Sequence, residues 1–178
     1  MDWTTRGRAH VLGHDIPHDG GVIAFDFVIR RVTSPEELLP HLFEEVDPTL
    51  RDRLRPGDFI VAGRNFLCGK AHNQGLIALK SLGIRILCVS MPFRSFRAAV
   101  GLAVPVLMGC AGITEHVRDG DEIEADMLTG TVTNVSTGQV RSYPPLPEGV
   151  RRTVASGGMQ GLLRAHLARH PEMAEPYA

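Results

Sequence analysis

The chain has 178 residues, 43% of them hydrophobic, and carries a formal net charge of −1 at pH 7. That length suits an ordinary hydrophobic core, so we expect residues 1–178 to form a single domain. The balanced charge and an aromatic content of 6% argue against nucleic-acid binding. The apolar runs stay below the roughly 20 residues of a transmembrane helix, and the first residues lack a signal peptide's apolar segment. We therefore expect a cytoplasmic protein that does not bind membranes.

The first half of the chain is predicted to hold two helices between short apolar segments. Ser34 and Glu37 are spaced as a capping box, and Pro35 occupies the first helical position, where its missing N–H is harmless. The expected segments are a strand over residues 9–12, turns over 14–21, an apolar stretch over 22–29, a helix over 35–46 and a shorter helix after residue 48.

Strand and helix patterns alternate through the middle of the chain. The predicted order is a strand over residues 59–62, a helix over 73–82, a strand over 84–89, a helix over 93–103 and a strand over 104–108. Such alternation predicts a parallel sheet whose strands are joined by right-handed helical crossovers.

The last third of the chain changes to an antiparallel pattern. Residues 121–127 alternate between apolar and acidic side chains, and turn-forming Thr-Gly pairs follow at 129–130 and 137–138. These features predict an antiparallel β region. Two short helices, interrupted by the glycine pair at 157–158, are expected to end the fold, and residues 171–178 are expected to fray.

The stretch over residues 57–84 carries the strongest functional signal. A strand runs into a glycine-containing loop, residues 68–73, that opens onto the start of a helix. A helix N-terminus presents free backbone N–H groups and a partial positive charge, and both favour an anion. Lys70 and His72 add side-chain donors at the same place. These residues predict a pocket for a carboxylate or phosphate, whereas the plainer interpretation is an ordinary strand-to-helix turn.

The same stretch resembles the small subunit of 3-isopropylmalate dehydratase, the swivelling domain of the aconitase superfamily. The family pattern is approximately Gly-Asp, three apolar residues, then Gly-(Lys/Arg)-Asn-Phe-Gly-Cys-Gly-Ser-Ser-Arg-Glu, and a helix that ends Ala-Leu-Lys-x-x-Gly-Ile. The matching residues are Gly57, Asp58, Gly63, Arg64, Asn65, Phe66, Cys68, Gly69, Ala78, Leu79, Lys80, Gly83 and Ile84. The similarity extends over nearly the whole chain, but the family's Ser-Ser-Arg-Glu is replaced by Lys70-Ala71-His72-Asn73.

The resemblance implies a fold, a reaction and a partner. The implied fold is a swivelling β/β/α domain of the α/β class, with a parallel sheet core and an additional antiparallel β region. The implied activity is that of a hydro-lyase subunit, which closes over a 4Fe–4S cluster of a separate large subunit and acts on a hydroxy di- or tricarboxylic acid. The chain itself is expected to hold no cofactor or metal ion, because Cys68, Cys88 and Cys110 are too few and too dispersed to ligate a cluster.

By their place in the family pattern, Lys70 and His72 are the predicted catalytic residues. Lys70 stands where the family has its serine base, and His72 stands where the family has an arginine that clamps a substrate carboxylate. The predicted substrate-binding residues are Gly69, Ala71, Asn73, Asp19 and Arg97. Asp19 belongs to the N-terminal loop that helps to select the substrate in the family, and Arg97 matches a family arginine.

Several alternatives stay open at this point. A neutral Lys70 could act as a general base, or a charged Lys70 could bind a carboxylate. A related hydroxy acid is favoured over isopropylmalate as the substrate. The alternative function is a non-catalytic paralogue that binds a large subunit or a small carboxylate without turnover. Two further alternatives are disfavoured by where helices can form: a thiol enzyme built on Cys68 and His72, and a metal site built on His10, His14 and His18.

Overall fold

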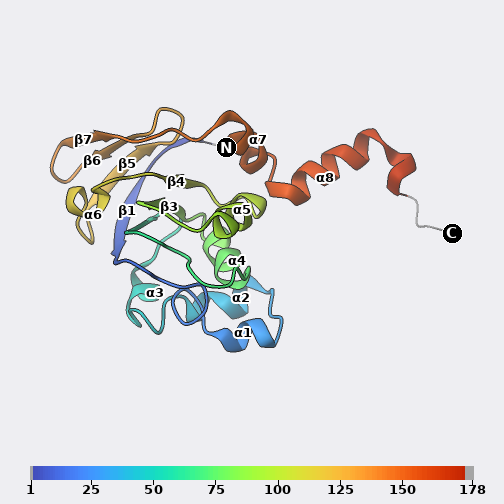
Figure 1. Cartoon of the computed structure of the whole chain (residues 1–178), viewed down its shortest axis with the longest axis horizontal. Coiled ribbons are helices and arrows are strands. Elements are labelled where there is room, and N and C mark those ends of the chain that lie inside the picture. The colour runs from blue at the N-terminus through green and yellow to red at the C-terminus, as the bar shows by residue number, and fades with distance from the viewer. Residues whose placement is uncertain (1, 175–178) are drawn as a thin grey trace.

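The computed structural model describes residues 2–174, which form one curled, seven-stranded sheet with the strand order β4-β3-β2-β1-β5-β6-β7 (Figure 1). Strands β4 to β1 pair in parallel, and strands β1, β5, β6 and β7 pair antiparallel. The predicted parallel core with an added antiparallel region is confirmed. The strands are β1 Thr4–Leu12, β2 Phe59–Ala62, β3 Arg85–Cys88, β4 Val106–Met108, β5 Glu122–Asp126, β6 Thr131–Asn134 and β7 Gln139–Ser142.

Strand β1 belongs to both halves of the sheet. Residues 4–8 pair antiparallel with β5, and residues 9–12 pair in parallel with β2. The predicted strand covers only the second part, because the first part alternates exposed and half-buried polar residues and lacks an apolar signal. Gly7 lies where the strand passes the turn before β2, and a Cβ there would lie 2.8 Å from the carbonyl oxygen of Gly57.

Two hydrophobic clusters lie on the two faces of the parallel strands, since neighbouring strand residues point to opposite faces. Ile60 and Ile86 join a cluster with buried residues of α2, α4 and α5, whereas Val61 and Leu87 join a second cluster with β5 and β6. The helices are α1 Phe25–Ile29, α2 Pro35–Leu38, α3 Leu50–Arg53, α4 Gln74–Ser81, α5 Phe93–Gly101, α6 Ile113–His116, α7 Glu148–Ala155 and α8 Gly158–Arg169, with 3₁₀ turns η1 Leu39–His41 and η2 Pro171–Ala174.

The predicted helix over residues 35–46 is wrong. Helix α2 ends at Leu38 and gives way to η1, which contains Pro40, a residue that has no N–H for a continuing helix. Phe43 then adopts a positive φ of 63°, which is incompatible with helix. The capping box is half confirmed: Glu37 N donates to Ser34 Oγ at 3.4 Å, while the Glu37 carboxylate pairs with Arg30.

The remaining helix predictions are largely confirmed. The short helix after residue 48 is α3, the helices over 73–82 and 93–103 are α4 and α5, and the glycine pair at 157–158, with φ of 86° and 78°, separates α7 from α8. Helix α6 has only four residues, too few for a periodic signal, and was not predicted. Of the tail expected to fray, residues 171–174 form η2 and the rest lie outside the described residues.

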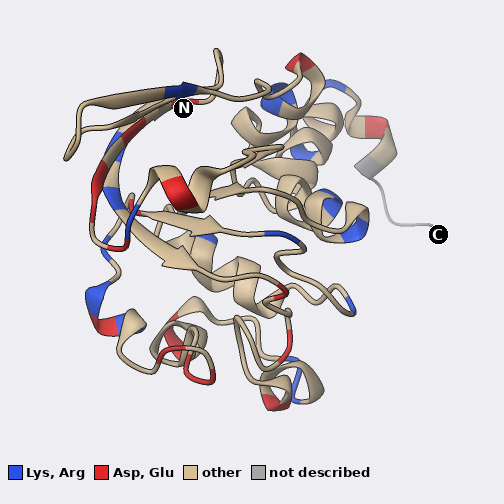
Figure 2. Cartoon of the chain, turned by 60° about the vertical axis from the view of Figure 1, so that its left-hand side comes forward, with Lys and Arg blue, Asp and Glu red and all other residues tan. Residues whose placement is uncertain are grey.

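The surface of the described chain mixes charges of both signs. Figure 2 shows acidic and basic residues interspersed along the curled end of the sheet, where Arg6 and Glu122 of β1 and β5 form two hydrogen bonds of 2.7 Å. Helix α8 extends away from the sheet (Figure 1) and has Leu163 more than half exposed. Within residues 2–174, no helix combines the length and the apolar character needed to cross a membrane.

Candidate functional site

The predicted anion-binding loop lies at the carboxyl ends of the parallel strands, where α/β sheets commonly bind ligands. The predicted loop, residues 68–73, is the second part of the connection between β2 and α4, residues 63–73. This β2–α4 connection is attached to the loops that follow the two neighbouring strands. Gly63 N donates to Gly13 O at 3.0 Å, and Phe66 N donates to Ser90 O at 2.9 Å. Three loops that are far apart in the sequence therefore meet at one edge of the sheet.

The backbone at this junction is strained. Asp15, Asn65 and Leu67 all have positive φ values, of 56°, 58° and 57°, although none of them is glycine. Such conformations are uncommon for residues with side chains and are often concentrated at functional sites. Asn65 is held by two contacts: its Nδ2 donates to Asp15 Oδ1 at 2.8 Å, and its backbone N–H donates to Ser90 Oγ at 2.9 Å.

A short backbone strap joins the β1–α1 loop to the β2–α4 loop. Cys68 N donates to Ile16 O at 3.2 Å, and His18 N donates to Cys68 O at 3.1 Å. Gly69 follows with a φ of 82°, a left-handed conformation that glycine adopts without a steric penalty. The strap places Asp19, the residue after His18, beside the end of the β2–α4 loop.

The backbone N–H groups between the strap and the second turn of α4 have no acceptor among the described residues. Within the described chain, no N–H group from residue 69 to residue 76 donates a hydrogen bond, and the first helical bond is Ile77 N to Asn73 O at 2.8 Å. Buried or half-buried backbone N–H groups normally find an acceptor. Gly75 lets this end of the helix approach Val22 closely, since a Cβ at residue 75 would lie 2.6 Å from Val22 Cγ1. The open donors and the helix N-terminus together suit an anion.

The side chains of His72 and Asp19 contact each other directly in the site. Both carboxylate oxygens of Asp19 lie 2.8 Å from His72 Nδ1. The side chains are only 16% and 23% exposed, respectively, so water screens the pair incompletely. The Phe25 ring packs against the imidazole, with the two ring centroids 5.9 Å apart. The predicted substrate residue Asp19 thus contacts a predicted catalytic residue directly.

A second histidine, His18, is buried behind this pair and connects the strap to α5. Its Nε2 lies 3.0 Å from Ser95 Oγ, and that hydroxyl donates to Leu67 O at 2.6 Å. Burial lowers the pKa of His18 to about 4, against the opposing effect of the Asp19 charge, which raises it. His18 is therefore neutral near pH 7 and serves as a hydrogen-bonding link.

The other residues of the replaced tetrapeptide are more open to solvent. Lys70 and Asn73 are exposed, and Ala71 is half-buried. Asn73 is the N-cap residue of α4, but its side chain makes no capping hydrogen bond. The Lys70 ammonium and the Asn73 amide are thus located at the same end of α4 as the open N–H groups.

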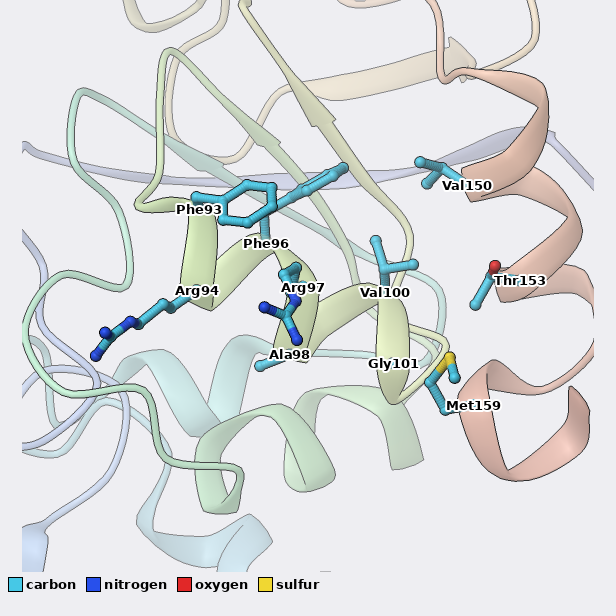
Figure 3. A pocket seen from close by; sticks show the side chains of 10 residues that line it. All are labelled: Phe93, Arg94, Phe96, Arg97, Ala98, Val100, Gly101, Val150, Thr153 and Met159. Atoms are coloured by element: carbon cyan, nitrogen blue, oxygen red, sulfur yellow. The ribbon is translucent and has the colours of Figure 1, made fainter. Parts of the chain in front are cut away.

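Arg97 lies apart from these residues and lines a cavity beside α5. The cavity, of about 620 Å³, lies between α5, α7 and α8, and the residues that line it include Arg97, Val100 and Met159 (Figure 3). Arg97 follows the buried Ser95 by two positions, or about 200° around a helix, so it faces away from the loop that Ser95 contacts. Its role in substrate binding stays a prediction.

Phe93 is not part of the hydrophobic core, since its side chain is 71% exposed. Phe93 opens α5, and the guanidinium of Arg97 lies 5.8 Å from its ring centroid. Phe96 does pack against the helix-side hydrophobic cluster, in a partly buried position. A Phe-x-x-Phe spacing places both rings on similar sides of the helix, but it does not show how far the covering elements reach.

The three cysteines have little thiolate character. Burial and the Asp15 charge raise the pKa of Cys68, whose Sγ contacts Asp15 O at 3.4 Å. Burial also raises the pKa of Cys88 and raises that of Cys110 to about 12. The nucleophilic form of a cysteine is the thiolate, so this environment argues against the thiol-enzyme hypothesis.

The three histidines spaced by four residues have separate partners. His10 Nε2 lies 2.9 Å from Asp58 Oδ2 in the interior, His14 Nδ1 accepts from Arg64 N at 2.8 Å, and His18 contacts Ser95. Across residues 2–174, no group of three or more His, Cys, Asp or Glu side chains is arranged to hold a metal ion.

Similarity to known proteins decides the family. The chain is 37% identical over 160 residues to 3-isopropylmalate dehydratase small subunit 1 of Methanopyrus kandleri, covering 89% of this chain and 92% of that protein. The chain belongs to the 3-isopropylmalate dehydratase small-subunit family. It is also 34% identical to the isopropylmalate/citramalate isomerase small subunit of Methanocaldococcus jannaschii, covering 92% and 95% of the two chains.

The solved structures agree with this assignment, and the predicted resemblance is confirmed. The crystal structure of a 3-isopropylmalate dehydratase from Methanocaldococcus jannaschii matches with a TM-score of 0.84 and 27% sequence identity, covering 96% of this chain and 99% of that chain. No family model matches the sequence.

The sequence did not predict the buried hydrogen bonds that lie behind the site. The link from His18 through Ser95 to Leu67 O joins three segments of the chain. Nothing in the spacing of these residues indicates that they meet. One signal was available, since Ser95 is a small polar residue between two phenylalanines near the start of a predicted helix.

Proposed function

We propose that this chain is the small subunit of a hydro-lyase that acts on a hydroxy di- or tricarboxylic acid together with an aconitase-like large subunit. The proposal is supported by family membership, since the relatives are named as small subunits of 3-isopropylmalate dehydratase and of isopropylmalate/citramalate isomerase. The large subunit would carry a 4Fe–4S cluster, which supplies Lewis-acid chemistry when bound. This chain would contribute the carboxylate-binding surface and the proton acceptor.

The observation that carries the proposal is the open run of backbone N–H groups from residue 69 to residue 76. These donors precede and begin α4, whose partial positive charge adds to them. Lys70 places a side-chain cation at the same end of the helix. A carboxylate can accept several such hydrogen bonds at once, and a di- or tricarboxylate has a second anionic group for a partner surface.

The substrate we propose differs from isopropylmalate. The family's serine hydroxyl and two-pronged arginine are replaced here by an ammonium at Lys70 and an imidazole at His72. An ammonium is a point charge, whereas a guanidinium binds a carboxylate through two parallel hydrogen bonds. We therefore propose that the substrate is a related hydroxy acid, whose carboxylate lies at a different position from the one that the family's arginine clamps.

Reconstitution with a large subunit tests the function. The chain is co-expressed with the aconitase-like large subunit of the same genome, and the anaerobically purified complex is assayed on 2- and 3-hydroxy di- and tricarboxylates. We expect formation of the unsaturated acid only when both subunits are present. Dehydration by this chain alone would contradict the two-subunit proposal, and a stable cluster-loaded complex without turnover on the whole panel would favour the non-catalytic paralogue.

A further inference from the structure

The pairing of His72 with Asp19 determines which ring nitrogen of His72 carries a proton. A carboxylate only accepts hydrogen bonds, so Nδ1 must be the N–H nitrogen where it faces both Asp19 oxygens at 2.8 Å. In a neutral imidazole the other nitrogen, Nε2, then carries a lone pair. Among residues 2–174, Nε2 has no hydrogen-bond partner, and it is not one of the polar atoms sealed from solvent without a partner.

The surroundings of His72 favour this arrangement. The buried His18, which interacts electrostatically with His72, is neutral near pH 7 and so does not add a positive charge. Lys70 lies two residues away and is exposed. The Phe25 ring lies against the imidazole, with an angle of 34° between the two ring planes.

We infer that Asp19 is a positioning residue that holds His72 with Nε2 as the proton acceptor of the reaction, while Lys70 stays charged and binds a carboxylate. This inference rests on the proposed function. In an elimination, the electron pair of the substrate C–H bond becomes the new double bond, hydroxide leaves the adjacent carbon, and the proton goes to Nε2. The imidazolium that results is stabilised by the Asp19 carboxylate. His72, held by Asp19, would thus act as the proton acceptor in place of the family's serine.

The first arm of the test measures the tautomer of His72 in the isolated full chain. Side-chain ¹⁵N chemical shifts near neutral pH distinguish Nδ1–H from Nε2–H, and His72→Gln assigns the signal. We expect the Nδ1–H form in the wild type. In Asp19→Asn the amide can donate to Nδ1, so we expect Nε2–H. Asp26→Asn, an exposed change on α1, is the matched control and should leave the tautomer unchanged. A wild-type Nε2–H form, or no difference in Asp19→Asn, would overturn the positioning role.

The second arm separates Asp19 and Lys70 in the reconstituted complex. With the best substrate found, we expect Asp19→Asn to lower kcat at least ~100-fold with KM within ~3-fold, because substrate binding stays intact while the proton acceptor is misoriented. Lys70→Ala should mainly raise KM. An Asp19→Asn enzyme with full kcat, or a Lys70→Ala enzyme whose loss is all in kcat, would overturn the assignment of the base. If the reconstituted complex turns over none of the acids, both the proposed function and the assignment of His72 as the base are wrong. The tautomer measurement on the isolated chain still tests whether Asp19 positions His72.

Discussion

His18 and Ser95 meet through a 3.0 Å contact between Nε2 and Oγ, and this contact ties the β1–α1 loop to α5 behind the candidate site. Both residues are buried, and Ser95 also donates to the carbonyl of Leu67 at 2.6 Å. The hydroxyl therefore satisfies polar groups from two loops that would otherwise lack a partner. The geometry of the site depends on this link, although neither residue belongs to the replaced tetrapeptide.

Ser95→Ala should lower the free energy of unfolding by about 1–3 kcal/mol, because it leaves the buried Leu67 carbonyl and Nε2 of His18 without their partner. Urea unfolding followed by circular dichroism measures the change. Ser156→Ala is the control, since its exposed hydroxyl contacts only Arg152 O on its own helix. We expect the control to stay within about 0.5 kcal/mol of wild type, and an equal loss in both variants would contradict the linking role.

Acid should destabilise the protein through His18. Its pKa in the folded protein, about 4, lies below the unfolded value of 6.5, so the unfolded chain binds the proton more readily between these pH values. The contribution of neutral His18 to the free energy of unfolding is fully present above pH 6.5. This contribution is lost as the pH falls toward 4, and the loss is at most about 3 kcal/mol. Urea midpoints from pH 7.5 to 4.5 should fall less steeply in His18→Gln than in wild type. His170→Gln, an exposed change, should retain the wild-type slope.

Gly75→Ala should destabilise the start of α4 by about 1–3 kcal/mol, because the added methyl group would lie 2.6 Å from Val22 Cγ1 in a packed region. Thermal unfolding of the variant measures the loss. Gly149→Ala is the matched control, since a Cβ there has no neighbour within 4 Å and the residue lies in α7. The control should be neutral or stabilising by a few tenths of a kcal/mol; a loss as large as that of Gly75→Ala would show that packing is not the cause.

Lys70→Ala should weaken binding of a dicarboxylate by about 1–3 kcal/mol, the usual contribution of a charged hydrogen bond. The chain contains only two lysines, so Lys80→Ala at the exposed C-terminal end of α4 is a natural control that should bind normally. Isothermal titration with a series of small di- and tricarboxylates gives the affinities. If Arg97→Ala weakens binding and Lys70→Ala does not, the ligand occupies the cavity beside α5 and not the loop.

Restoring the first three residues of the family tetrapeptide should reduce the native reaction and add little activity on isopropylmalate. The triple variant Lys70→Ser, Ala71→Ser and His72→Arg removes the imidazole that pairs with Asp19 and introduces a serine into a loop whose other partners differ. The measurement is kcat/KM of wild type and variant on isopropylmalate and on the best native substrate, each with the large subunit. A wild type that already dehydrates isopropylmalate at about 10⁴ M⁻¹s⁻¹ or better would contradict the proposed change of substrate.

Local patterns were sufficient for the parallel half of the fold. Short sequence patterns, of about ten residues, were enough to predict these elements. Examples are strand β2, whose four residues are all buried, and helix α4, which ends just before Gly83. Local patterns failed where the structure depends on distant partners: α2 stops before Pro40, and Phe93 stays exposed because no described element covers it. Exposure is set by where other parts of the chain pack, which spacing alone does not reveal.

For the site, the sequence by itself determined the family, the glycine-containing loop before α4 and the replacement of the family's serine and arginine by Lys70 and His72. Each of these is a property of residues that are neighbours in the sequence, so it does not depend on how the chain folds. Only the tertiary structure decided that Asp19 pairs with His72 and that Arg97 lines a cavity away from the loop. Those relationships join residues 53 positions apart or on opposite sides of one helix. They arise from the parallel pairing of β1 with β2, which brings the two loops together at one end of the sheet.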